Sequence, residues 1–382
     1  MDALVNGRVF TGDGWLDRHV VLLEGGTVLD VVRPGEVPAA ARPVDLGGRR
    51  LVPGFVDLQV NGGGGVLFND TPTVDGLRRI ASAHRRFGTT ALLPTLITTD
   101  TPTMQAAAVA VDAAIRERVP GILGIHFEGP HLDPARAGVH DPALIRPPGP
   151  GDLDLLTSLH AGRTLVTLAP NRVEAEFVAA LVARGARVSA GHTDGGFEAL
   201  TRMHAAGISG YTHLFNAMSP LASRAPGAVG AALADPEVAA GIIVDGHHVH
   251  PASVRIAHAC KPAGRLFLVT DAMPPVGASL TRFELGGRAI EVRDGRCTDG
   301  DGRLAGAVLD MASAVRTCVD LVGIALDEAL RMASAYPARF LGLGETHGRI
   351  GTGARADLVL LDEALEVRAT WIGGAALWET RG

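Results

Sequence analysis

Lysine is almost absent from this 382-residue sequence: Lys261 is the only one, and the other basic residues are arginines. A Schiff-base enzyme, a phosphate-loop NTPase and a carboxylated-lysine metal centre each need a lysine in the site. Lys261 would have to fill that role, but it lies between a predicted helix and a predicted strand, facing away from the candidate site described below. We therefore do not expect any of these three kinds of lysine-dependent site. The preference for arginine over lysine is itself best explained by codon bias.

Cysteines, long apolar runs and blocks of like charge are also scarce. The three cysteines, Cys260, Cys297 and Cys318, have no pairing or metal-binding spacing, which is typical of a reducing compartment. No apolar run approaches the ~18 residues that cross a bilayer, and the N-terminus has no secretory pattern. The net charge is −6, and no basic patch is present. We expect a cytoplasmic protein that binds neither membranes nor nucleic acid.

The middle of the chain alternates between apolar runs and segments with helical periodicity. The runs are Leu51 to Val60, Thr90 to Ile97, Ile122 to Phe127, Leu165 to Leu168, Val188 to Ala190, Gly210 to Leu214, Ala240 to Val244 and Leu266 to Val269. Helices are predicted between them, at segments such as Val74–Phe87, Val173–Arg184, Phe197–Ala206 and Ala252–His258. Eight strand–helix units are the number in a (β/α)8 TIM barrel, so the sequence predicts this α/β fold.

The two ends of the chain differ from the middle, because both contain short predicted strands separated by turn residues. We predict that residues 1–50 and 346–382 together build one small β-sandwich domain. Residues 51–345 would then form the TIM barrel. Within it, residues 281–302 indicate β-hairpins inserted near the barrel mouth, where they could cover a site.

Active sites of such barrels lie at the carboxyl ends of the strands, so polar residues at those ends are the candidates. Glu128, His192 and His213 lie at the ends of three different runs and would converge around one axis. One carboxylate and two imidazoles, with a fourth position left for water, form a catalytic zinc site. Such a metal lowers the pKa of its water to ~7, which makes hydroxide available at neutral pH. This pattern predicts a metal-dependent hydrolase.

Asp271 ends the eighth run, across the predicted barrel mouth. There it would take the proton of the water and return it to the departing amine, which amide hydrolysis requires. Each residue also has a structural alternative: a lone histidine is often simply buried, while Glu128 or Asp271 could cap a turn or a following segment. Four such residues at four strand ends favour the metal site. His247, His248 and His250 could suggest a second metal, but their spacing alone is weak evidence.

Seven motifs are spread along the chain: Pro53–Gly62, Leu93–Thr99, Phe127–Pro130, Ser189–Thr193, Thr212–Met218, Val269–Ala272 and Leu304–Gly306. Together they resemble the N-acetylglucosamine-6-phosphate deacetylase family of the amidohydrolase superfamily, and the resemblance runs nearly from end to end. It implies hydrolysis of the acetamide of N-acetyl-D-glucosamine 6-phosphate to D-glucosamine 6-phosphate and acetate, in amino-sugar catabolism or recycling.

The resemblance also implies roles for individual residues. Glu128, His192 and His213 would bind one divalent metal ion per subunit, usually zinc, and Asp271 would act as general base and then as general acid. The implied substrate-binding residues are Val139, His140, Asn216, Ala217, Arg224, His248, Leu304, Ala305 and Gly306. Among these, His140 would help to polarise the acetyl carbonyl. His248 and Arg224 would hold the 6-phosphate, with Arg224 supplied across a homodimer interface.

Two features of the sequence depart from, or vary within, the related sequences. Many amidohydrolases carry His-x-His at the end of the first strand, where this chain has Gln59 and Asn61. Neither amide is a strong zinc ligand, so we expect one metal rather than two, with Gln59 and Asn61 near the water or behind the ligands. His131 could be an extra ligand or a lid residue, and the sequence leaves its role open, as it does for His250.

Two other functions stay open at this point. A different amidohydrolase, such as an N-acyl-amino-acid deacylase or a cyclic-amide hydrolase, would act on a substrate without phosphate, and Arg224 with His248 argues against it. A non-catalytic sugar-phosphate-binding barrel would have no use for Asp271 beside a complete set of metal ligands. The sequence favours the deacetylase over both.

Overall fold

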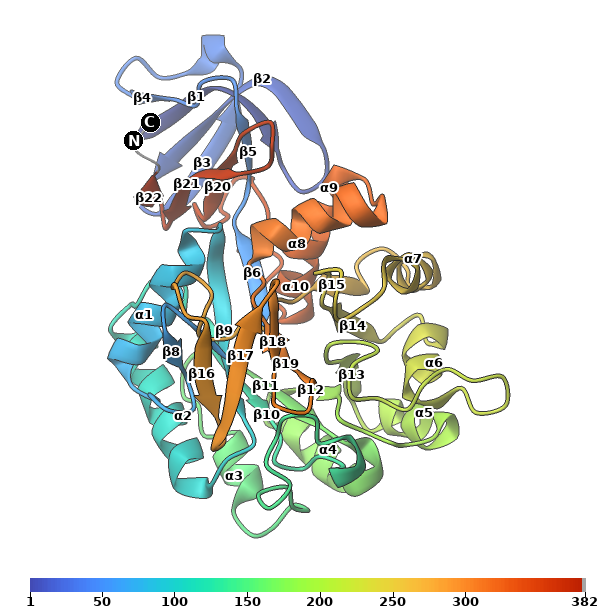
Figure 1. Cartoon of the computed structure of the whole chain (residues 1–382). Coiled ribbons are helices and arrows are strands. Elements are labelled where there is room, and N and C mark those ends of the chain that lie inside the picture. The colour runs from blue at the N-terminus through green and yellow to red at the C-terminus, as the bar shows by residue number, and fades with distance from the viewer. Residues whose placement is uncertain (380–382) are drawn as a thin grey trace.

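The computed structural model describes residues 1–379, and their central part forms a nearly closed barrel of eight parallel strands (Figure 1). In pairing order the strands are β6 (Phe55–Val60), β9 (Thr89–Ile97), β10 (Gly124–Glu128), β11 (Arg163–Leu168), β12 (Arg187–Ala190), β13 (Ile208–Tyr211), β14 (Ala239–Ile242) and β15 (Leu266–Leu268). The segment after β15 meets β6, because Asn61 donates its backbone N–H to the carbonyl of Ala272 at 2.9 Å. The predicted barrel is confirmed, and each predicted apolar run overlaps one of its strands.

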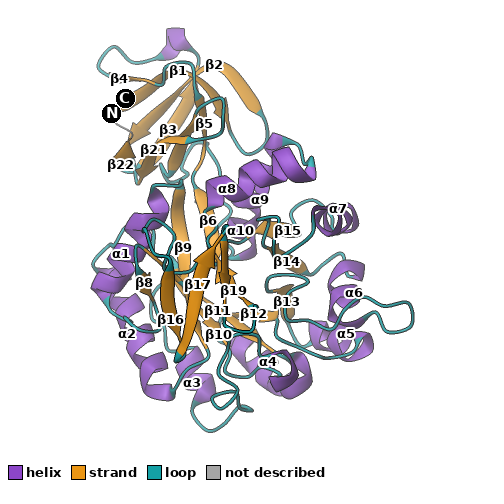
Figure 2. Ribbon diagram, in the orientation of Figure 1, coloured by secondary structure: helices purple, strands orange, loops and turns teal. Residues whose placement is uncertain are grey.

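Helices cover the outside of the barrel (Figure 2). They are α1 (Val74–Arg85), α2 (Thr101–Arg116), α3 (Asp152–Leu156), α4 (Ala175–Ala183), α5 (Phe197–Ala205), α6 (Gly227–Ala234), α7 (Pro251–Cys260), α8 (Met311–Thr317), α9 (Leu326–Ala333) and α10 (Ala335–Phe340). Capping side chains set their starts: Thr73 accepts from Gly76 N–H at 3.1 Å before α1, and Asp100 accepts from Thr103 N–H at 2.8 Å before α2. Within residues 1–379, no helix is both long and apolar enough to cross a bilayer.

Strands from the N-terminal and C-terminal parts of the chain share one sheet beside the barrel (Figure 1). Its strands are β1 (Asp2–Phe10), β2 (Trp15–Glu24), β3 (Thr27–Val32), β4 (Arg42–Asp45), β5 (Arg50–Pro53), β20 (Leu358–Leu361), β21 (Val367–Ile372) and β22 (Ala375–Glu379). The two parts meet where β5 pairs antiparallel with β20, and a separate apolar core that includes Leu4, Leu51 and Trp371 lies against them. Of the C-terminal part predicted as 346–382, residues 380–382 lie outside the described residues.

The first predicted run, Leu51 to Val60, is divided between the two sheets. Its first residues belong to β5 in the terminal sheet, and its last residues form β6 in the barrel. Gly54 joins them, and a Cβ atom there would lie 2.1 Å from Thr90 Oγ1, so only glycine fits this close approach. Hydrophobic periodicity cannot reveal this division, because both strands are buried and read as one apolar run.

A small antiparallel sheet lies over the barrel mouth, which we call the cover sheet (Figure 1). It consists of β16 (Arg282–Leu285), β17 (Arg288–Arg293), β18 (Arg296–Thr298) and β19 (Leu304–Ala307), and a short pair, β7 (Gly62–Gly63) with β8 (Val66–Leu67), lies after β6. The last cover strand is tied to the barrel, since Ala307 donates its N–H to the carbonyl of Asp271 at 2.9 Å. The cover sheet is thus anchored beside the end of β15.

Candidate active site

Four acidic and histidine side chains meet at the barrel mouth, each placed by the end of a different strand. Glu128 is the last residue of β10, while His192, His213 and Asp271 follow β12, β13 and β15. The last three adopt left-handed backbone angles, with φ of 46°, 34° and 52°. Residues other than glycine rarely adopt this conformation, which costs roughly 1–3 kcal/mol each. The fold therefore holds these side chains at the mouth against a local backbone preference.

Three of these side chains form a close triangle of candidate metal-ligand atoms. His213 Nε2 lies 3.0 Å from Glu128 Oε1 and 3.0 Å from His192 Nε2, and His192 Nε2 lies 3.3 Å from Glu128 Oε1. A tetrahedral ion with bonds of ~2.0–2.1 Å separates its ligands by about 3.3 Å, so these edges fit a cation such as zinc. All three side chains are buried. The residues predicted as ligands are brought together in a geometry that can hold an ion.

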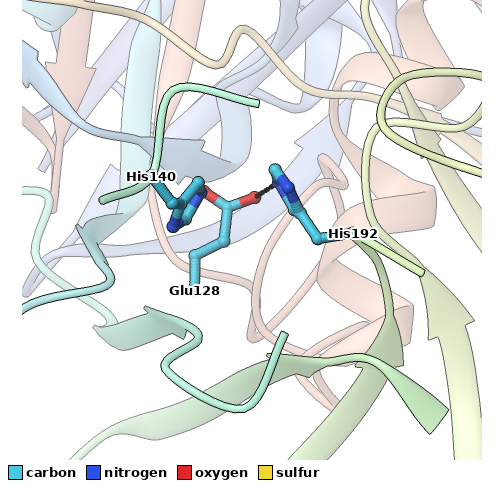
Figure 3. Close-up of side chains that lie close together, drawn as sticks. All are labelled: Glu128, His140 and His192. Carbon is cyan, nitrogen blue, oxygen red and sulfur yellow. Dashed lines mark ion pairs between the residues drawn. The ribbon is translucent and has the colours of Figure 1, made fainter. Parts of the chain in front are cut away.

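His140 lies beside Glu128 and His192 (Figure 3), and the ligand atoms of these three residues all lie within 4.8 Å of one another. Hydrogen bonds distinguish the two histidines. His192 donates from Nδ1 to the carbonyl of Arg136 at 2.9 Å, which leaves the lone pair of Nε2 free for a metal. The backbone N–H of Thr98 donates to His140 Nδ1 at 3.2 Å, so the neutral ring carries its proton on Nε2. His140 therefore offers a hydrogen-bond donor rather than a ligand.

Burial and neighbouring charges give these groups distinct protonation states. Burial alone raises the pKa of Glu128, but the adjacent imidazoles of His192 and His213 outweigh it and hold that pKa well below its usual value. Burial lowers the pKa of His140 to about 3, and the neighbouring His192 adds to the effect. At neutral pH, Glu128 is therefore a carboxylate and His140 a neutral donor.

Asp271 is joined to the triangle by a side-chain amide. Gln59 donates from Nε2 to Glu128 Oε1 and to Asp271 Oδ1, at 3.1 Å in both cases. Asn61 donates to the same Asp271 oxygen at 2.6 Å. Burial and the charge of Glu128 raise the pKa of Asp271 to about 6. A carboxyl group with a pKa near neutrality is suited to accept a proton and to return it.

A cavity of about 300 Å³ opens in front of these groups. Of the predicted substrate-binding residues, the structure places Val139, His140, Asn216, Ala217, His248, Leu304 and Gly306 in its lining. Ala305 and Arg224 lie outside the lining. Ala305 is buried under the cover sheet with Ile290 and Cys297, because successive residues of a strand point to opposite faces. Arg224 is exposed on the loop before α6, which projects from the barrel (Figure 1).

His248 is held by a buried carboxylate. Its Nδ1 lies 2.6 Å from Asp245 Oδ2, and both side chains are almost fully buried. Burial alone raises the pKa of Asp245, but the hydrogen bond from His248 outweighs it and lowers that pKa to about 2. Asp245 is therefore ionised at neutral pH and orients the imidazole, leaving Nε2 of His248 available to the cavity.

The residues left open by the sequence lie outside the ligand triangle. His131 is buried and donates from Nδ1 to the carbonyl of Arg146 at 3.0 Å, so it fastens the loop that carries His140. His250 accepts a backbone N–H at 3.1 Å and caps α7. Lys261 donates from Nζ to two backbone carbonyls at the end of α6, remote from the mouth, as the sequence indicated.

Sequence reasoning missed Arg136 and Gly138, which also line the cavity. The strand-end pattern selects residues where strands stop, whereas these two lie in the loop between Glu128 and His140. Their position between two predicted site residues on one short loop was the signal that could have found them.

Comparisons with known proteins match nearly the whole chain. A model of the amidohydrolase family matches residues 50–377, and a model of the NagA composite domain matches residues 1–51. Among curated proteins, the chain is 48% identical to the N-acetylgalactosamine-6-phosphate deacetylase of Shewanella sp. (strain ANA-3), over 86% of this chain and 83% of that protein. It is 34% identical to the N-acetylglucosamine-6-phosphate deacetylase of Haemophilus influenzae, over 97% of this chain and 98% of that protein.

A solved structure agrees with these matches. The crystal structure of N-acetylglucosamine-6-phosphate deacetylase from Pasteurella multocida is 35% identical in sequence and superposes with a TM-score of 0.96, covering 99% of this chain and 100% of that one. The resemblance inferred from the sequence motifs is confirmed.

Proposed function

This chain belongs to the amidohydrolase family, and we propose that it hydrolyses the acetamide of N-acetyl-D-glucosamine 6-phosphate to D-glucosamine 6-phosphate and acetate. The observation that carries the proposal is the triangle of Glu128, His192 and His213 joined through Gln59 to Asp271. The relatives and the solved structure described above are named for the same chemistry on sugar phosphates. The reaction belongs to amino-sugar catabolism or recycling.

The ligand triangle supports one zinc ion per subunit. An ion bound by Glu128, His192 and His213 would supply Lewis-acid activation of water and of the acetyl carbonyl. One carboxylate oxygen and two imidazole nitrogens at tetrahedral spacing suit zinc. Gln59 and Asn61 take the places where other amidohydrolases have further histidines, and both amides are engaged with Asp271. This supports a single ion.

Two side chains would handle hydrogen bonds and protons during the reaction. His140 donates from Nε2 to the acetyl oxygen, where negative charge develops as the carbonyl is attacked. Asp271 takes the proton of the attacking water on Oδ2, since Oδ1 is occupied by Asn61 and Gln59. The same carboxyl then returns this proton to the departing nitrogen, because an unprotonated amide nitrogen is a poor leaving group.

The remaining expectations concern binding and location. We infer that His248 and Arg224 bind the 6-phosphate and that Arg224 comes from the partner in a homodimer, because Arg224 is exposed and outside the cavity of its own chain. Asn216, Ala217, Leu304 and Gly306 would contact the sugar. The unpaired cysteines support a cytoplasmic location.

A second substrate has its own support. The 48% identical Shewanella relative is named for the 6-phosphate of N-acetylgalactosamine, which differs from the glucosamine compound only in the orientation of one hydroxyl group. Both substrates carry the same acetamide and the same phosphate. The chemistry derived above therefore applies to either sugar.

Acetate release tests the proposal directly. Metal-quantified protein is assayed with N-acetylglucosamine 6-phosphate, N-acetylgalactosamine 6-phosphate and unphosphorylated N-acetylglucosamine. We expect a kcat/KM for a phosphorylated sugar at least about 100-fold above that for the unphosphorylated one, since phosphate recognition contributes several charge-assisted hydrogen bonds. Preference between the two phosphorylated sugars identifies the substrate. Equal activity with and without phosphate would instead favour another kind of amidohydrolase.

A further inference from the structure

Arg136 is the only arginine or lysine among the described residues that lines the catalytic cavity. It lies in the loop between Glu128 and His140, and the cavity it faces is also lined by the carboxylates of Glu128 and Asp271. None of the roles assigned above uses its side chain. Only its backbone carbonyl has been accounted for, as the acceptor that orients His192.

The guanidinium of Arg136 is held by an ion pair along one edge only. Its Nε lies 2.8 Å and its Nη2 lies 2.7 Å from Asp194 Oδ1. Asp194 itself follows His192 closely, so the ion pair is fixed next to the metal-binding segment. Within residues 1–379, Nη1 of Arg136 has no acceptor, and the side chain is 34% exposed. One edge of a planar, permanently charged group therefore stays available at the cavity.

The charge of the cavity explains what this edge is suited to bind. A phosphorylated sugar brings up to two negative charges into a cavity that two carboxylates already line. His248 is engaged with the carboxylate of Asp245, and Arg224 of the same chain is exposed on a loop and does not line the cavity. Arginine binds phosphate oxygens through paired N–H donors. Arg136 is the cation of this kind that the same chain places in the lining of the cavity.

We propose that Arg136 binds the phosphate group of the substrate from within the same chain, with Nη1 as a contacting atom. This inference rests on the proposed function, since it takes a phosphorylated N-acetylhexosamine as the substrate. Asp194 pairs with Nε and Nη2 on the other edge of the guanidinium and makes no contact with the phosphate in this arrangement. The alternative is that the pair of Arg136 and Asp194 only fastens the loop over the site.

Substitution of Arg136 by glutamine separates the two roles. We expect Arg136→Gln to raise KM for N-acetylglucosamine 6-phosphate, or for the galactosamine epimer if that is the better substrate, by about tenfold or more, with a smaller change in kcat. The loss in kcat/KM should be at least about tenfold larger for the phosphorylated sugar than for the unphosphorylated one. A role confined to the loop would reduce both to the same extent.

Asp194→Asn is the matched control, because it breaks the same ion pair and keeps the cation. We expect its KM for the phosphorylated sugar to stay within about threefold of the wild type, since the guanidinium can still reach phosphate. Inorganic phosphate provides a second readout, as a competitive inhibitor whose inhibition constant should rise about tenfold in Arg136→Gln and little in Asp194→Asn.

Several results would overturn the inference. One is an unchanged KM and an unchanged phosphate inhibition constant in Arg136→Gln, and another is an equal loss in Arg136→Gln and Asp194→Asn. If Arg136→Gln does not fold, Arg136→Lys replaces it, because lysine keeps the positive charge but lacks the paired N–H donors of the guanidinium. A wild-type KM and a wild-type phosphate inhibition constant in Arg136→Lys would also contradict the inference. A wild-type enzyme without preference for the phosphorylated sugar would overturn the proposed function instead.

Discussion

Asn61 donates a hydrogen bond of 2.6 Å from Nδ2 to Asp271 Oδ1, and Asp271 Oδ2 has no partner among residues 1–379. Because Gln59 binds the same oxygen, one side of the carboxylate is fixed and the other is left to exchange a proton. Two amides at positions 59 and 61 thus bind the proposed acid–base group, where histidines at the same positions could bind a second ion. The residues that depart from the pattern of many amidohydrolases are those that orient Asp271.

Asp271→Asn should retain the metal and lose about 10³-fold or more in kcat, within the usual range for a general acid–base residue. An asparagine still accepts the hydrogen bond from Asn61 through its oxygen, but its amide nitrogen cannot take the proton of the water. Acetate release and metal content are measured on the same preparation. Turnover close to the wild-type rate would reject the assigned proton transfer.

Two histidine variants distinguish a ligand from a donor. His140→Ala should keep the ion and lose about 10²- to 10³-fold in kcat, because its Nε2–H contacts the developing charge. His192→Ala should lose the ion itself, because its Nε2 carries the free lone pair. Metal content after dialysis against metal-free buffer separates these outcomes. Loss of metal in His140→Ala would place His140 among the ligands and contradict the hydrogen-bond argument from Thr98.

Much of this site could be predicted from the sequence because a barrel repeats one unit. Each apolar run identifies a strand, and the strand ends form one rim, so Glu128, His192, His213 and Asp271 could be grouped although they lie far apart in the chain. The structure brings these four side chains together. This rule selects only residues at strand ends, so it missed Arg136, which lies on a loop.

Other features depend on contacts that no pattern in the sequence encodes. The proton on His140 is placed by the backbone of Thr98, which belongs to the loop after β9. The lone pair of His192 is freed by a carbonyl of the loop after β10. Ala305 was predicted with its neighbours to line the pocket, yet strand alternation turns its side chain under the cover sheet. Such details follow from three-dimensional placement alone.

Asp57 gives the folded chain a predicted pH dependence near neutrality. Burial raises the pKa of this carboxyl from 3.8 to about 7, against the hydrogen bonds it accepts from Thr270 and Gln59. The folded state thus binds the proton more tightly than the unfolded state, so this group lowers stability as pH rises from about 4 to about 7. Asp57→Asn has no such proton, and its amide can donate to Thr270 Oγ1 while its oxygen accepts the backbone N–H groups.

The test compares urea unfolding of wild type and Asp57→Asn at pH 5, 6, 7 and 8. The free energy of unfolding of the variant relative to the wild type should increase with pH, by at most about 1.4 kcal/mol per pH unit, and level off above pH 7. A difference that is constant over this range would show that Asp57 is ionised throughout.

Removal of the metal should abolish activity and lower thermal stability. Without an ion, one carboxylate and two imidazoles are left crowded in a buried triangle, and an ion that binds only the folded state stabilises it. We expect a chelated protein with no acetate release and a lower Tm, and full recovery with one equivalent of zinc per chain. Full activity after exhaustive chelation, or a requirement for two ions per chain, would contradict the single-ion site.

Arg224 tests whether the site is completed by a second subunit. Arg224→Ala alone should raise KM for the phosphorylated sugar by about tenfold or more with little change in kcat, because the guanidinium contacts only the phosphate. Asp271→Asn alone should be nearly inactive. If Arg224 crosses the interface of a homodimer, a mixed dimer of these two variants contains one site with an intact Asp271 from one chain and an intact Arg224 from the other.

Mixing the two variants under conditions that exchange subunits should therefore restore low-KM activity to about a quarter of the wild-type sites, since half of the dimers are mixed and each has one complete site. As a control for simple addition of activities, the same two variants are combined under conditions in which their subunits do not exchange. If Arg224 instead served its own chain, no mixed dimer would hold a complete site, and the low-KM activity would stay absent. A monomer in solution would exclude the shared site altogether, because an exposed arginine outside the cavity of its own chain would then have no route to the phosphate.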